Sequence, residues 1–114
     1  MVSIDVVVCS KLTRLISVYF PHSNLAPQLL DECYAQVFAL IEDAMAKHLA
    51  FLVGGDFNLT LDDGPRGIQL QELIDRFNLQ VCNHPHRLAM HDAWTYEHTL
   101  HGRHHIDFIL ASHH

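Results

Sequence analysis

The sequence predicts an α/β fold, with a mixed or antiparallel central sheet and flanking helices, and three observations support this prediction. Apolar segments rich in valine and isoleucine open and close the chain, as strands do. Two longer segments between them repeat their apolar residues every three or four positions, as amphipathic helices do. Glycine, proline and aspartate separate these segments. The 114 residues, 49% of them hydrophobic, suffice for one core, so they form one domain or part of one.

The first two strands are predicted over residues 2–8 and 14–20, where β-branched and aromatic residues are frequent. The short and mostly polar connection at 9–13 predicts a hairpin between them. Pro21 ends the second strand, because proline has no backbone N–H to donate to a neighbouring strand.

A long helix is predicted over residues 27–47, with Pro27 in its first turn and Ser23 or Asn24 as its cap. Its expected buried face consists of Leu30, Tyr34, Val37, Phe38, Ile41 and Met45. A polar loop is expected at 60–67, followed by a second amphipathic helix. The apolar residues of that helix are Leu70, Leu73, Ile74 and Phe77.

Four further strands are expected, at 50–53, 79–82, 93–96 and 106–110. The stretch at 83–92 is rich in histidine and proline and is predicted to be a loop. A histidine-rich turn around Gly102 is expected to join the last two strands.

Composition narrows the functional classes. The formal net charge of −6 argues against binding nucleic acid by bulk cationic attraction, although a metal ion and a few placed basic groups would still permit local action on DNA. Neither a membrane helix nor a secretory signal is recognisable. The three cysteines form no CxxC pair and are expected to be small buried residues. We therefore expect an intracellular protein, nuclear or cytoplasmic, with no membrane partner.

The run Gly54-Gly55-Asp56-Phe57-Asn58 follows an apolar strand and is the most informative motif. On extended backbone, the side chains of Asp56 and Asn58 would point the same way, because alternate residues share a face. A carboxylate and a carboxamide that converge on one point suit a divalent metal used in phosphate chemistry. Asp56 and Asn58 are therefore the candidate metal ligands.

Three segments in this order resemble the endonuclease/exonuclease/phosphatase family: Tyr19-Phe20-Pro21-His22, Gly55-Asp56-Phe57-Asn58 and Ile106-Asp107-Phe108-Ile109-Leu110. Trp94-Thr95-Tyr96, followed by a turn that contains Gly102, is most similar to retroelement-type endonucleases. The resemblance implies part of a four-layer, DNase I-like α/β sandwich that hydrolyses nucleic-acid phosphodiesters with activated water. It also implies Mg²⁺ or Mn²⁺ as the cofactor and DNA as the partner of the full domain.

The same resemblance assigns catalytic roles to four residues. Asp56 matches the aspartate that activates or orients the attacking water, and Asn58 matches the asparagine that positions this water or the scissile phosphate. Tyr19 matches the tyrosine whose phenol contacts the phosphate. Asp107 matches the aspartate that buttresses a catalytic histidine.

Three further residues are candidates for substrate binding. His22 stands where the family has asparagine, and His105 stands where it has arginine or another basic residue. Both imidazoles can donate hydrogen bonds. Trp94 belongs either to the core or to the DNA-facing rim.

Two family motifs have no counterpart in the sequence. No glutamate precedes Tyr19 and no Asp-His pair follows Asp107, whereas family members carry a metal-binding glutamate and a Ser-Asp-His motif at these places. Residues 1–114 are therefore interpreted as a partial domain, without its N-terminal and extreme C-terminal portions, and as an incomplete catalyst. A non-catalytic retroelement remnant or interaction module is an alternative, as is a phosphomonoesterase or phospholipid phosphodiesterase. Unpaired strand edges and an uncovered sheet face predict self-association.

Other metal sites fit the sequence less well. Residues 56–62 imitate the start of an EF-hand loop, but Leu61 and Gly67 stand where that loop needs glycine and glutamate. Several histidines cluster without cysteine partners, which indicates exposed polar loops more than a tetrahedral zinc site. These are His84, His86, His101, His104, His105, His113 and His114.

Overall fold

The computed structural model describes residues 1–21, 27–59, 64–83, 96–98, 102–104 and 107–112. Its helices and strands are β1 (Val2–Val8), β2 (Lys11–Tyr19), α1 (Pro27–Ala46), β3 (Ala50–Asp56), α2 (Gly64–Arg76), β4 (Gln80–Val81), β5 (Tyr96–His98), β6 (Gly102–His104) and β7 (Asp107–Ala111). They follow the expected order with one additional strand, β6. Of the strand predicted at 93–96, residues 93–95 lie outside the described residues.

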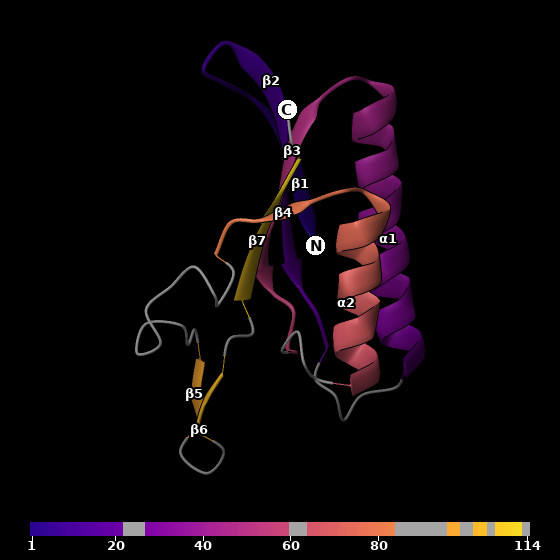
Figure 1. Ribbon diagram of the computed structural model, residues 1–114. Helices are drawn as coiled ribbons and strands as arrows, with labels where there is room; N and C mark the ends of the chain where they lie inside the picture. Colours follow the sequence, from indigo (N-terminus) through magenta and orange to yellow (C-terminus); the bar gives the residue numbers. More distant parts are fainter. Residues whose placement is uncertain (22–26, 60–63, 84–95, 99–101, 105–106, 113–114) are drawn as a thin grey trace.

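A five-stranded mixed sheet, in the order β1-β2-β3-β7-β4, forms the centre of the fold (Figure 1). β2 and β3 are parallel and α1 connects them, while the other neighbouring pairs are antiparallel. β5 and β6 pair in a separate two-stranded sheet. This confirms the prediction of a mixed α/β fold with a mixed central sheet.

Both helices lie on the same face of the five-stranded sheet (Figure 1). Val37 of α1 and Leu73 of α2 are completely buried, and so is Val53 of β3, which faces them. Aromatic contacts extend this core to the end of the sheet, where the rings of Phe20 and Phe57 meet edge to face at 4.8 Å. Alternation along the strands therefore gives the sheet one buried apolar face.

The β1–β2 hairpin is tighter than its sequence suggests. Cys9 and Ser10 both adopt positive φ angles, 50° and 65°, as the two central residues of a type I′ turn do. The turn therefore takes only two residues of the predicted 9–13 connection, and β2 begins at Lys11.

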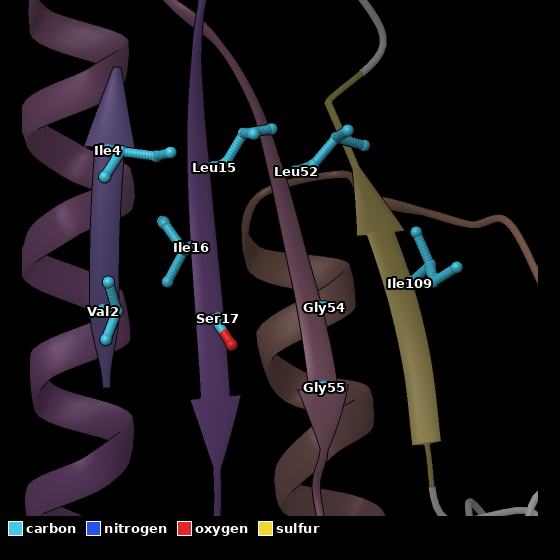
Figure 2. Close-up of a pocket in the computed structure, with 9 residues that line it drawn as sticks. All are labelled: Val2, Ile4, Leu15, Ile16, Ser17, Leu52, Gly54, Gly55 and Ile109. Carbon is cyan, nitrogen blue, oxygen red and sulfur yellow. The ribbon is translucent and has the colours of Figure 1, made fainter. Parts of the chain in front are cut away.

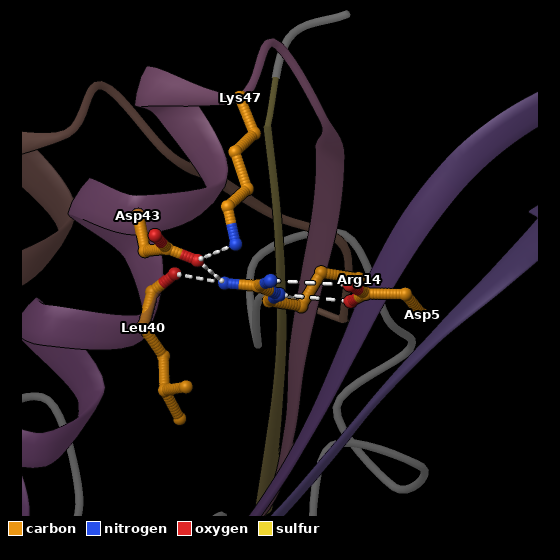
Figure 3. A network of polar contacts seen from close by, with 5 residues as sticks. All are labelled: Asp5, Arg14, Leu40, Asp43 and Lys47. Atoms are coloured by element: carbon orange, nitrogen blue, oxygen red, sulfur yellow. Dashed lines mark hydrogen bonds and ion pairs between the residues drawn. The ribbon is translucent and has the colours of Figure 1, made fainter.

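The buried Arg14 side chain joins the hairpin to α1 through ion pairs with two exposed aspartates (Figure 3). Its guanidinium donates to both carboxylate oxygens of Asp5, at 2.8 and 3.1 Å. It also donates to Asp43 Oδ2 at 2.7 Å and to the Leu40 carbonyl at 3.1 Å. Lys47 lies 3.0 Å from the same oxygen of Asp43. The hydrogen bonds from Arg14 lower the pKa of both aspartates, and Lys47 lowers that of Asp43 further.

Most of the predicted apolar positions of the two helices are buried, whereas Phe38 and Phe77 are only partly buried. Met45 is 47% exposed and Ala44 is buried in its place, because a period of 3.6 residues moves the stripe from Ile41 to position 44. α2 begins at Gly64, inside the predicted loop at 60–67, with Pro65 in the first turn that proline favours.

Two other predictions are wrong. Gly102 begins β6, where the sequence predicts the centre of a turn, and residues 99–101 lie outside the described residues. Cys9 and Cys82 are exposed and Cys33 is half-buried, because the first two lie just beyond strand ends, where the chain faces solvent. All three thiols are free.

Candidate active site

The ends of three neighbouring strands bring Tyr19, Asp56 and Asp107 together. Tyr19 ends β2 and is paired in register with Asp56 at the end of β3. Asp56 is in turn paired with Asp107, the first residue of β7. Paired residues on neighbouring strands have their Cα atoms about 5 Å apart and their side chains on the same face. The three side chains therefore form one row across the sheet, which we call the polar row.

The polar row lies on the face of the sheet that is opposite the helices. The intervening positions Val18, Phe57 and Phe108 are buried in the core, so Tyr19, Asp56 and Asp107 project to the other side. Tyr19 is 66% exposed, whereas the two aspartates are half-buried. The row is therefore accessible to a ligand from solvent.

Asn58 occupies a different position from the one that its sequence spacing predicts. β3 ends at Asp56, and Asn58 has a left-handed φ of 51°, so the premise of extended backbone through residue 58 is wrong. Asp56 Oδ1 accepts a hydrogen bond from the Asn58 backbone N–H at 2.8 Å, which closes a tight turn. The Asn58 carboxamide donates to the carbonyl of Phe20. Asn58 therefore holds the chain that follows Tyr19.

Several hydrogen bonds to backbone groups fix the end of β2. One of them comes from Arg66, which the sequence does not identify as part of the site. The Phe20 N–H donates to the Asp56 carbonyl at 2.8 Å, and Arg66 Nη2 donates to the Pro21 carbonyl at 2.8 Å. Arg66 lies in the first turn of α2, and nothing in the sequence separates it from an ordinary surface arginine. With Asn58 on Phe20, these contacts position the backbone that carries the Tyr19 phenol.

A buried tyrosine, Tyr34, lies close to Arg66. The hydroxyl of Tyr34 and the Nε of Arg66 are both buried, and neither has a hydrogen-bond partner among the described residues. Burial raises the pKa of Tyr34 well above its ordinary value, with a smaller opposing effect from the positive charge of Arg66. Tyr34 therefore stays neutral at physiological pH.

Asn83 fixes the strand that carries Asp107. Its Nδ2 donates to the Asp107 carbonyl at 3.0 Å, and its Oδ1 accepts from the Ile109 N–H at 2.9 Å. The side chain thus imitates a neighbouring strand at the start of β7. The sequence predicts Asn83 at the start of a loop. The only sequence signal for its role is that a carboxamide can donate and accept hydrogen bonds as a backbone amide does.

The polar row offers the right ligand chemistry for a hard divalent cation but few ligands. Asp56 and Asp107 are like charges in directly paired positions, which a cation would relieve. Hydrated Mg²⁺ is commonly held by one or two carboxylates. Among the described residues, however, no group of three or more His, Cys, Asp or Glu side chains gathers around one point. Asp56 remains a candidate ligand, whereas the carboxamide nitrogen of Asn58 is engaged by Phe20.

The substrate-binding candidates His22, Trp94 and His105 lie outside the described residues. The predicted caps Ser23 and Asn24 lie outside them too.

Comparison of the chain with known protein families, with curated proteins and with solved structures finds no match in any of the three. In the part of the chain that the structure describes, neither helix combines the length and the apolar character needed to cross a bilayer.

Proposed function

We propose that this chain is part of a metal-dependent phosphodiesterase or endonuclease domain that acts on nucleic acid. The observation that carries the proposal is the polar row. Its three residues are far apart in sequence, since 88 positions separate Tyr19 from Asp107. Strand register nevertheless aligns them with Asp56 on one face of the sheet, at the same end of the strands. The sequence motifs that resemble the endonuclease/exonuclease/phosphatase family contain these same residues.

The row suits phosphodiester hydrolysis, which depends on positioning and on neutralising charge at the phosphate oxygens. The Tyr19 phenol can donate a hydrogen bond to a phosphate oxygen, and its exposure leaves it accessible. The Asp56 carboxylate can accept a hydrogen bond from a water molecule and so orient it. A divalent ion held by Asp56, with Asp107 beside it, would supply positive charge next to the phosphate.

The layers of the fold support the finer proposal of a four-layer, DNase I-like sandwich. Helices cover one face of the sheet, and the other face carries exposed apolar residues such as Val2 and Ile4. This is the arrangement of one half of a sandwich in which two sheets pack face to face.

We expect this chain to bind the metal weakly and to lack turnover by itself. The sequence has no glutamate before Tyr19 and no Asp-His pair after Asp107. A non-catalytic role that keeps the fold is the second candidate. It is favoured by the engagement of Asn58 with Phe20 and by the lack of a third ligand among the described residues.

Metal binding can be measured by Mn²⁺-induced broadening of amide NMR signals, followed by Mg²⁺ competition. The amides near Asp56 and Asp107 should broaden first. Asp56→Asn should weaken binding by about tenfold or more, because it removes a charged oxygen ligand. Asp75→Asn, which alters an exposed aspartate on α2, is the matched control and should leave binding unchanged. Equal binding by wild type and Asp56→Asn would refute the metal site.

Catalysis is tested separately by nicking of supercoiled plasmid in Mg²⁺. We expect no nicking by the chain alone. Metal-dependent nicking that disappears in Asp56→Ala would show that the chain catalyses hydrolysis unaided, and would exclude the non-catalytic role.

A further inference from the structure

The face of the sheet opposite the helices is apolar across four strands. Val2 and Ile4 of β1 are 64% and 54% exposed, Ile109 of β7 is 46% exposed and Leu52 of β3 is 36% exposed. Leu15 of β2 lies between Ile4 and Leu52 in register and completes the patch. Figure 2 shows these side chains on the near side of the sheet with both helices behind. We call this patch the open face.

The centre of the open face is hollow. Ser17 and Gly54 are paired in register, and Gly54 is also paired with Ile109, so small residues lie between larger ones. The result is a shallow, apolar hollow of about 480 Å³ (Figure 2). A hollow between larger side chains can accept side chains from a second apolar surface. In this way the side chains of two sheets that pack about 10 Å apart interdigitate.

The size of the open face fits a weak dimer. Four strands spaced about 4.8 Å apart, over about six residues of about 3.3 Å each, cover about 400 Å². This exceeds the scattered exposure of single apolar residues that is usual on a soluble protein. Two such footprints total about 800 Å², which is below the roughly 1,200 Å² of standard interfaces and in the range of weak, transient ones.

Charge selects one orientation for two stacked copies. Asp56 and Asp107 lie at one end of the sheet, whereas Lys11 begins β2 at the other end. Stacking with like ends together would bring four carboxylates close in a chain of net charge −6. A twofold axis that crosses the strands places each acidic end over the partner's basic end.

We propose that the open face binds a second copy of this chain. The two sheets pack face to face, with β3 of one copy running opposite to β3 of the other, and the helices lie outside. The dimer has four layers in the order helix, sheet, sheet, helix. This inference requires neither a metal nor a substrate. In the dimer, the partner's sheet takes the place that the proposed four-layer sandwich gives to its second sheet.

Sedimentation velocity tests the proposal over about 1–200 μM protein, the range in which an interface of this size should dissociate. The buffer contains EDTA to remove metal and a reductant to prevent disulfides through Cys9 and Cys82. The mass should rise from one chain of 13.0 kDa to two and then stop. A monomer at all concentrations, or a mass that grows beyond two chains through the outer edge of β1, would overturn the proposal.

Two variants and a control locate the interface. Leu52→Lys places a charge at the centre of the open face and should weaken dimerisation by at least about tenfold. Ile4→Lys should act in the same direction, and circular dichroism checks that both variants fold. Ile68→Lys changes a residue of α2 that is 60% exposed and should have no effect. Dimerisation of folded Leu52→Lys and Ile4→Lys with wild-type affinity would refute the assignment.

Lys11→Glu tests the orientation. It should weaken the dimer, since it places a carboxylate over the acidic end of the partner. An unchanged or stronger dimer would overturn the antiparallel arrangement.

Discussion

Gly55 allows a sharp test of how β3 is held beside β2. Its φ is +136°, a conformation that L-residues rarely adopt, and a Cβ placed there would lie 2.1 Å from the Val18 carbonyl oxygen. Backbone strain of this kind costs about 1–3 kcal/mol, and the contact can be relieved only by moving one strand from the other. We expect Gly55→Ala to lower the free energy of unfolding by at least about 2 kcal/mol.

The neighbouring glycine supplies a matched control. A Cβ on Gly54 would have the Phe108 carbonyl oxygen as its nearest neighbour, at 3.8 Å, which is an ordinary contact. Gly54 also has no positive φ, so Gly54→Ala should change stability by no more than about 0.5 kcal/mol or should stabilise the fold slightly.

Urea denaturation followed by circular dichroism, at a protein concentration that keeps the chain monomeric, measures both variants. In a separate thermal scan, the melting temperature of Gly55→Ala should fall by roughly 8 °C, given the size of the domain. Equal losses in the two variants would refute the reasoning, because they would mean that any side chain in this motif is harmful and that the contact with Val18 is not the cause.

Two further predictions concern titration. Arg14 lowers the pKa of Asp5 and Asp43, so their contribution to stability is present above the unfolded pKa of about 3.9 and is lost as pH falls through the lower folded values. Replacement of both aspartates by asparagine should flatten the loss of stability measured by urea denaturation below about pH 4, and an unchanged slope would contradict the network. Burial raises the pKa of Tyr34, so its contribution is complete below the unfolded pKa of about 10 and declines as pH rises toward the folded value. Tyr34→Phe should reduce the loss of stability above about pH 10 and should be neutral or stabilising at pH 7, since it removes a buried hydroxyl that has no described partner. Destabilisation of Tyr34→Phe by more than about 1 kcal/mol at pH 7 would show that the hydroxyl has a bonded partner.

The sequence predicted the elements of the fold well because hydrophobic periodicity sets them. Four of the predicted stripe residues of α1, Leu30, Tyr34, Val37 and Ile41, are buried as expected, and β1 spans the predicted residues. Periodicity gives no information on turn geometry. The positive φ angles of Cys9 and Ser10, which tighten the first hairpin, are therefore not evident in a connection that contains neither glycine nor asparagine.

The candidate site was predictable only in part. Tyr19, Asp56 and Asp107 were chosen from their motifs, and their alignment in one row depends on strand register, which no local pattern specifies. Asn58 was placed wrongly because the rule of alternating faces holds only while the backbone stays extended. Arg66 and Asn83 act through backbone carbonyls far away in sequence, so their roles depend on tertiary packing.

The strand order has a consequence for the way the chain folds during synthesis. β7 is the last of the described strands along the chain, yet it lies between β3 and β4 in the sheet. Until residues 107–111 leave the ribosome, β3 has one unfilled edge and β4 has no strand to join. From the completion of β3 until then, the nascent chain exposes an unpaired strand edge, a state in which aggregation competes with folding.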